Sequence, residues 1–134
     1  MADDRPVSAS PSSPPPPASN QASFVQRLVE IVATLRAPGG CPWDREQTHS
    51  SLRGALLEEA HEVIDAIDSG DLVNLREELG DLLLHVIFHA QIQTEVGGFN
   101  LEDVAETSCE KMIRRHPHVF GENAGQLGLS LIHI

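Results

Sequence analysis

Residues 56–84 read LLEEAHEVIDAIDSGDLVNLREELGDLLL, and this stretch decides the fold. A Ser-Gly-Asp turn at residues 69–71 divides it, and the aspartate is a suitable N-cap for the segment that follows. We therefore predict one helix over about residues 50–69 and another from the turn to about Val96, where two glycines stop it. Because the turn is short, the two helices are expected to be antiparallel neighbours.

Two further helices are predicted to flank this hairpin. Ser23, with a glutamine three residues later, begins a helix of regular apolar spacing, and the Ala-Pro-Gly-Gly sequence at 37–40 ends it. A polar loop over residues 41–49 leads to the hairpin. Asn100 caps a last helix, which Pro117 bounds. Patterns typical of strands are nearly absent, so the sequence predicts an all-α, antiparallel helical bundle.

The composition predicts one small domain with a distinct segment at each end. The chain has 134 residues, and six of its nine prolines fall within residues 1–22. This Ser/Pro-rich segment buries too little apolar surface to offset the entropy cost of ordering, so we expect a disordered tail. The domain is predicted over residues 23–121, with a separate tail at 122–134. A domain of this size is expected to cover its apolar faces by dimerising.

Net charge and cysteine content exclude several classes of protein. The formal net charge is -11, from 20 acidic and 9 basic residues, which argues against binding to nucleic acid polymers. Cys41 and Cys109 form neither a CxxC pair nor a disulfide framework. No apolar run approaches the roughly 20 residues that span a bilayer, and the N-terminus lacks the apolar region of a signal peptide. By elimination we expect a cytoplasmic protein with no membrane partner.

Four acidic side chains are spaced so that they meet across the hairpin. Glu59 and Glu62 share one helix face, and Glu78 and Asp81 share another, because the members of each pair are three residues apart. Glu62 and Glu78 each lie eight residues from Gly70, and Glu59 and Asp81 each lie eleven residues from it. At a rise of about 1.5 Å per residue the four carboxylates come level, two from each helix.

These carboxylates have apolar neighbours such as Val63 and Leu82, so part of the cluster is expected near the core. Uncompensated like charges there would raise their pKa values or recruit a cation. A hard divalent ion suits four carboxylates, and Mg²⁺ is the usual partner of phosphate substrates. The alternative is a solvated acidic face on two surface helices, which the matching register across the hairpin disfavours.

A basic cluster lies near the end of the last predicted helix. Lys111, Arg114 and Arg115 are three of the nine basic residues of the chain. If this helix packs on the hairpin, the cluster creates an anion site beside the metal, where arginine binds phosphate oxygens bidentately and lysine supplies a point charge. The alternative is ordinary complementation of a helix C-terminus by cations. Together with the acidic cluster, these residues indicate phosphate chemistry.

Residues 24–121 resemble the MazG nucleotide pyrophosphohydrolase domain. The resemblance rests on four segments in the same order, which are CPWDREQTH at 41–49, LLEE at 56–59 with Glu62, EELGDLL at 77–83, and KMIRRHPHVF at 111–120. It implies an all-α, magnesium-dependent enzyme that hydrolyses nucleoside triphosphates to nucleoside monophosphate and pyrophosphate. It also implies assembly as a dimer or higher homo-oligomer.

The resemblance assigns roles to individual residues. The metal ligands of the family's ExxE…ExxD motif fall on Glu59, Glu62, Glu78 and Asp81. Glu58 lies beside them and is expected to hold an attacking water or to contact the site, which makes it a catalytic candidate together with Glu59 and Glu62. Lys111, Arg114 and Arg115 would contact phosphate. Trp43, the only tryptophan, either stacks on a nucleotide base or plugs the core under its loop.

Two features depart from the family pattern. Many relatives contain two copies of this domain, whereas this chain has one, which most resembles the first copy in its CPWD and RHPHVF segments. The family pattern continues past Phe120 into another helix, whereas residues 123–134 look unrelated.

Two other readings of the sequence stay open. A carboxylate-bridged di-iron bundle uses paired ExxH motifs, and Glu58 with His61 forms one such motif, but there is no second. His85 and His89 continue the stripe of Asp81 and could ligate zinc or iron, although histidines in such positions are more often packed or hydrogen-bonded. The remaining alternative is a non-catalytic helical module that binds nucleotide or a protein partner without turnover.

Overall fold

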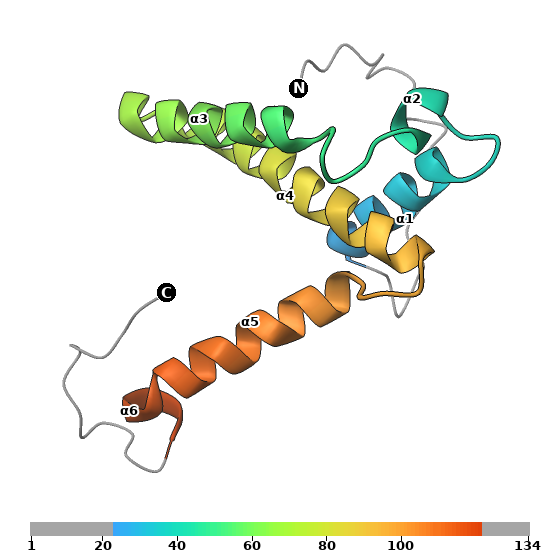
Figure 1. Ribbon diagram of the computed structural model, residues 1–134. Coiled ribbons are helices and arrows are strands. Elements are labelled where there is room, and N and C mark those ends of the chain that lie inside the picture. The colour runs from blue at the N-terminus through green and yellow to red at the C-terminus, as the bar shows by residue number, and fades with distance from the viewer. Residues whose placement is uncertain (1–22, 122–134) are drawn as a thin grey trace. The chain divides into compact units, whose positions relative to one another are not determined.

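The computed structural model describes residues 23–121, and the two predicted tails lie outside the described residues. All regular elements in this part of the chain are helices, which confirms the predicted all-α class (Figure 1). They are α1 (Phe24–Arg36), α2 (Pro42–Arg45), α3 (Arg53–Ser69), α4 (Leu72–Glu95), α5 (Leu101–Arg115) and α6 (Pro117–Phe120). The chain divides between Ile92 and Gln93 into two compact units, and each is described by itself.

Short polar residues begin α1, α4 and α5, as the sequence predicts. The Ser23 hydroxyl accepts a hydrogen bond from the backbone N–H three residues later at 3.1 Å, and the Asp71 carboxylate does the same for α4 at 3.1 Å. Asn100 and Asp103 form a full capping box at the start of α5, with two reciprocal bonds of 2.9 Å. Gly70 ends α3 with a φ of 72°, a left-handed conformation that glycine adopts without strain. These caps place the α3–α4 turn where it was predicted.

Two predicted boundaries differ from the structure, and one short helix was not predicted. The loop predicted over residues 41–49 contains the short helix α2, which begins at Pro42. The helix after it begins at Arg53 and not near residue 50. Pro117 bounds α5 as predicted, and it also begins the short helix α6, which the sequence analysis did not predict. In α2 and α6 the reason is the same, because proline at the first helical position loses no intrahelical hydrogen bond and has a φ suited to the first turn.

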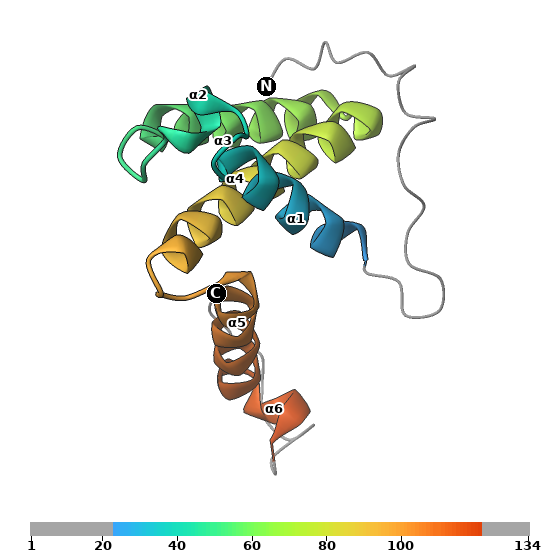
Figure 2. The same cartoon turned by 90° about the vertical axis from the view of Figure 1, so that its right-hand side faces the viewer.

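The first unit is built on the α3–α4 hairpin, whose helices lie side by side and antiparallel in both views (Figures 1 and 2). Helix α1 lies against the C-terminal half of α4, where the Arg36 guanidinium sits 5.7 Å from the ring centre of Phe88. The buried apolar residues of this unit are Val32, Leu52, Val63, Ala66, Ile87, Phe88 and Ala90. Among the described helices, none is both long and apolar enough to cross a membrane.

The second unit contains α5 and α6, which meet at a bend around His116. The Nδ1 atom of His116 lies 2.7 Å from the carbonyl oxygen of Met112, one turn earlier in α5. His118, in α6, is buried, and its ring is tilted by 42° against that of His116. The bend therefore changes the chain direction directly after the basic residues of α5.

Candidate active site

Three carboxylates meet between α3 and α4. Glu59 comes from α3, and Glu78 and Asp81 come from α4, with one oxygen of each lying within 4.8 Å of the others. Glu59 is only 2% exposed, and the other two side chains are half-buried. The structure thus brings together three of the four acids that the spacing from Gly70 placed level. It is the only such group of potential metal ligands within residues 23–121.

The fourth predicted ligand, Glu62, lies beside this group and is not one of its three members. It is half-buried and lies three residues after Glu59 on α3. Glu58 is exposed and lies one residue before Glu59, next to the same group. All five predicted acids of the site are therefore found on facing parts of α3 and α4. Their exposure differs because they occupy successive angular positions around the helices.

The electrostatics of the group favour a bound cation. A hydrogen bond with Glu59 raises the pKa of Glu78 above its usual range, burial and the charges of Glu59 and Asp81 act in the same direction, and the hydrogen bond with Glu62 opposes them. In addition, the Oε1 atom of Glu78 is buried and accepts no hydrogen bond from the described residues. A divalent cation would supply the missing partner and reverse the repulsion, and a set of carboxylate oxygens suits a hard ion. The residues present therefore fit a divalent metal.

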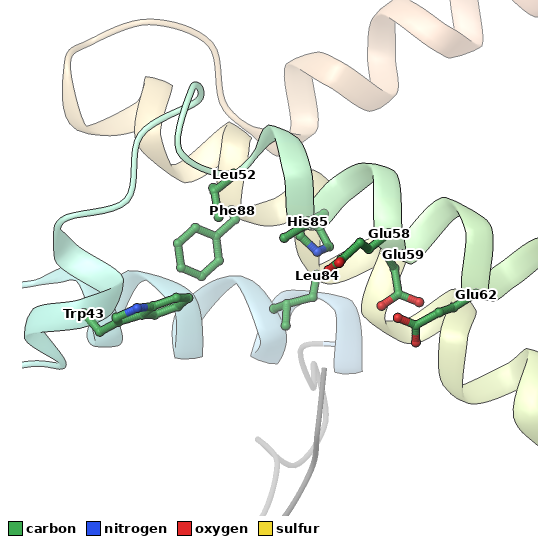
Figure 3. Close-up of a pocket in the computed structure, with 9 residues that line it drawn as sticks. Trp43, Leu52, Glu58, Glu59, Glu62, Leu84, His85 and Phe88 are labelled. Carbon is green, nitrogen blue, oxygen red and sulfur yellow. The ribbon is translucent and has the colours of Figure 1, made fainter.

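A cavity of about 190 Å³ opens beside the carboxylates (Figure 3). Its polar end is formed by Glu58, Glu59, Glu62 and His85, and its apolar end by Trp43, Leu52, Ala55, Leu84 and Phe88. Figure 3 shows the rings of Trp43 and Phe88 on one side of the cavity and the glutamates on the other. A nucleotide has the same division, with charged phosphates at one end and an aromatic base at the other.

Trp43 is 64% exposed at the edge of this cavity. It is therefore not a core plug under its loop, which was one of the two roles open from the sequence. Leu52 and Phe88, which the sequence analysis did not single out, are buried and form the apolar end with it. No local motif marks these two residues, because they belong to the cavity only through the way α2, α3 and α4 pack.

His85 and His89 have different surroundings, although both lie on α4. His85 lines the cavity, and burial lowers its pKa while the charge of Asp81 acts in the opposite direction. The Nδ1 atom of His89 lies 2.7 Å from that of His49. Neither belongs to the group of metal-ligand atoms, and His61 is exposed on α3. A di-iron site built on ExxH motifs is thus not assembled in the described residues.

The predicted basic residues lie on α5 in the second unit. Lys111 and Arg114 are exposed, and Arg115 is half-buried. All three fall in the last turns of the helix, directly before the bend at His116. The carboxylates belong to the first unit, and the proximity of these residues to them stays a prediction.

Comparison with known proteins places the chain in a family. The sequence profile of the MazG nucleotide pyrophosphohydrolase domain matches residues 47–120. Over 100 residues the chain is 56% identical to the nucleoside triphosphate pyrophosphohydrolase/pyrophosphatase MazG of Thermotoga maritima, with 75% of this chain and 39% of that protein covered. Over 103 residues it is 46% identical to the nucleoside triphosphate pyrophosphohydrolase of Escherichia coli K12, with 76% and 39% covered.

The fold agrees with this assignment. The crystal structure of a mazG-related protein from Thermotoga maritima superimposes with a TM-score of 0.59 at 35% sequence identity, covering 78% of this chain and 88% of that one. The chain spans about two fifths, 39%, of the length of the two enzymes named above. Since the profile match alone extends over more than half of the 134 residues, the chain belongs to the MazG nucleotide pyrophosphohydrolase domain family.

Proposed function

We propose that this chain hydrolyses nucleoside triphosphates to nucleoside monophosphate and pyrophosphate in the presence of Mg²⁺, with residues 23–121 as the catalytic domain. The observation that carries the proposal is the cavity between α2, α3 and α4, which has carboxylates at one end and aromatic side chains at the other. Its polar end adjoins the Glu59, Glu78 and Asp81 group. The printed names of the MazG relatives state this activity for those proteins.

We assign the metal to Glu59, Glu78 and Asp81, with Glu62 as the fourth ligand. The support is the approach of three of these side chains to within 4.8 Å, the raised pKa of Glu78, and its buried Oε1 atom. When bound, Mg²⁺ supplies Lewis-acid polarisation of phosphate oxygens and lowers the pKa of water. The choice of Mg²⁺ among divalent ions rests on the hardness of the oxygen ligands and on the phosphate substrate.

The chain's own residues would then position the reactants. Glu58 is exposed and borders the cavity beside Glu59, where it would accept a hydrogen bond from the attacking water and orient it. Lys111, Arg114 and Arg115 would contact phosphate oxygens and neutralise the charge that develops on the leaving pyrophosphate. Trp43 would stack on the base, since its exposed ring edges the apolar end of the cavity.

We further propose that two copies of the chain associate. Exposed apolar residues recur at seven-residue spacing on both long helices, as Leu57 and Ile64 on α3 and as Leu72, Leu79 and Val86 on α4. Such spacing is typical of helices that pack against a partner helix. The proposed partner is thus the same apolar helical surface of a second copy of the chain. A chain with a net charge of -11 is not expected to bind nucleic acid polymers or anionic membranes.

We also propose a cytoplasmic location. The support is that Cys41 and Cys109 are both free thiols, the state that a reducing compartment maintains.

The test is pyrophosphate release from a panel of NTPs and dNTPs, with Mg²⁺ and with EDTA. We expect Glu59→Gln to lower kcat/KM at least about a hundredfold, because it removes a metal ligand without changing side-chain size. Glu77→Gln is the matched control, since Glu77 is exposed and next to Glu78 but outside the acidic group. Its kcat/KM should stay within about threefold of wild type.

The same experiment distinguishes an enzyme from a binding module. A folded wild-type protein that binds nucleotide in an isothermal titration but releases no pyrophosphate would refute the catalytic proposal. Equal losses in the two variants would refute the assignment of the metal ligands.

A further inference from the structure

Helix α2 carries Trp43 but is too short to be stable without contacts to other parts of the chain. It has four residues, and its N-cap residue, Cys41, makes no side-chain capping bond. A single helical turn is unstable alone, because nucleation costs more than the few hydrogen bonds return. The orientation of Trp43 at the cavity must therefore be set by contacts from outside the helix.

Arg36, at the end of α1, makes contacts of this kind. Its Nη1 group donates hydrogen bonds to the carbonyl oxygen of Asp44 at 2.7 Å and to that of Gln47 at 3.0 Å. The Asp44 carbonyl lies in the last turn of α2, where helix carbonyls attract cations, and the Gln47 carbonyl lies in the loop directly after α2. Bonds from a charged donor are among the stronger hydrogen bonds in proteins. Arg36 thus acts as an external C-cap of α2.

The same guanidinium also lies near Phe88, the second aromatic side chain that lines the cavity. Its central carbon lies 5.7 Å from the centre of the Phe88 ring, within the range of a cation–π interaction. Phe88 is 7% exposed and lines the cavity from α4. One side chain therefore connects the helix that carries Trp43 with Phe88, the other aromatic residue at the apolar end of the cavity.

Gln47 extends this connection to Trp43 itself. Its Nε2 group donates a hydrogen bond of 3.0 Å to the carbonyl oxygen of Trp43, and its Oε1 atom accepts one of 2.7 Å from the Ser51 hydroxyl. Arg36 binds the backbone of Gln47, while the side chain of Gln47 binds the backbone of Trp43. The loop after α2 is thus attached both to Arg36 and to the backbone of Trp43.

We propose that Arg36 is a positioning residue for the substrate cavity, which holds α2 through Asp44 and Gln47 so that Trp43 stays at the apolar end of the cavity with Phe88 and receives the nucleobase. The inference rests on the proposed function in one respect only, namely that the ligand at this end of the cavity is a base. The attachment of Trp43 through Arg36 is a property of the chain itself and can be tested without substrate.

The experiment uses the full chain and the fluorescence of Trp43, which is its only tryptophan. Time-resolved anisotropy reports nanosecond motion of this side chain and its helix. We expect Arg36→Met to increase the amplitude of the fast depolarisation. Arg36→Lys should increase it by a smaller amount, because a lysine retains the charge but lacks the planar guanidinium group that donates several hydrogen bonds. Arg45→Met removes the same charge from an exposed position on α2 and should leave the anisotropy unchanged.

Kinetics supply the second readout. Arg36→Met should raise KM for the triphosphate about tenfold while kcat changes by less than about threefold, because base binding is lost and the acidic group is intact. Gln47→Glu replaces the amide donor by a carboxylate of equal size and should shift both readouts in the same direction. If circular dichroism shows that Arg36→Met is unfolded, Arg36→Lys and Gln47→Glu decide the outcome.

Wild-type anisotropy in Arg36→Met and Gln47→Glu would overturn the proposal, whatever the kinetics. A lower Tm with reduced kcat, unchanged KM and unchanged anisotropy would also overturn it, since that is the signature of a merely structural residue. A wild-type protein without pyrophosphate release would refute the proposed function, and the anisotropy would then decide the role of Arg36 alone.

Discussion

His49 and His89 form a contact that joins the loop after α2 to α4. Their Nδ1 atoms are 2.7 Å apart, and the rings are parallel to within 3° with centroids 4.9 Å apart, so the rings meet edge to edge. One nitrogen must donate and the other must accept, which is possible only while at least one ring is neutral. Burial lowers the pKa of His89, and the charges of His49 and His85 add to this effect.

A pH dependence of stability follows from this pair. Since the pKa of His89 is lower in the folded than in the unfolded chain, the unfolded chain binds more protons between the two values, and stability falls as the pH falls below about 6.5. We expect His89→Gln to flatten the dependence of the free energy of unfolding on pH between about 5 and 7, measured by urea denaturation. His61→Gln, at an exposed position on α3, should retain the wild-type slope. Equal slopes in wild type and His89→Gln would contradict the assignment.

At the scale of elements, the long helices follow from local rules, whereas the α1–α2 connection depends on a close backbone approach. The Gly40 N–H donates to the carbonyl oxygen of Ala37 at 2.8 Å, and the Cys41 N–H donates to that of Leu35 at 2.8 Å. A Cβ atom at Gly40 would collide with the carbonyl oxygens of Leu35 and Thr34. The glycine is therefore needed for space, and it sets where α2 begins relative to α1.

Gly40→Ala is expected to lower the free energy of unfolding by about 1–3 kcal/mol, because rigid backbone atoms must move to admit the methyl group. Gly54→Ala makes the same chemical change in α3, where nothing lies within 4 Å of the new atom. That variant should be neutral or more stable by up to about 1 kcal/mol, given the higher helix propensity of alanine. Chemical denaturation of both variants checks the difference. A neutral Gly40→Ala would show that the turn tolerates rearrangement.

At the scale of the whole molecule, several large apolar side chains of the long helices stay exposed to solvent. Leu72 and Leu79 are two such residues on α4, and they lie seven residues apart. Burial of such residues contributes about 1.5–3 kcal/mol each relative to exposure, so association of two copies through them would be favourable. The proposed homodimer accounts for this surface.

Leu79→Glu tests the dimer, because it places a charge within the exposed heptad positions. We expect it to weaken self-association at least about a hundredfold, since a buried unpaired carboxylate is costly. Light scattering over a concentration series measures the effect. Ser50→Glu adds the same charge at an exposed loop position and should leave the mass unchanged. A monomeric wild type, or a dimeric Leu79→Glu, would contradict the proposed interface.

Much of the fold could be predicted from the sequence, because it depends on interactions over a few residues. Caps at Ser23, Asp71 and Asn100 and the left-handed Gly70 are local, and they determine where the long helices begin and end. Once the hairpin turn is known, the regular rise of a helix brings the carboxylates level. The predicted meeting of Glu59 with Asp81 needed no further information.

The remainder was decided only by tertiary structure. The three-carboxylate group leaves Glu62 at its side, and the cavity includes Phe88 and Leu52, neither of which a local motif marks as part of a site. Arg36 reaches carbonyls eight and eleven residues away, and His49 meets His89 across 40 residues. Spacing along one helix does not encode such contacts, because they depend on how α1 and α2 pack on α4 and thus on the shapes of many side chains at once.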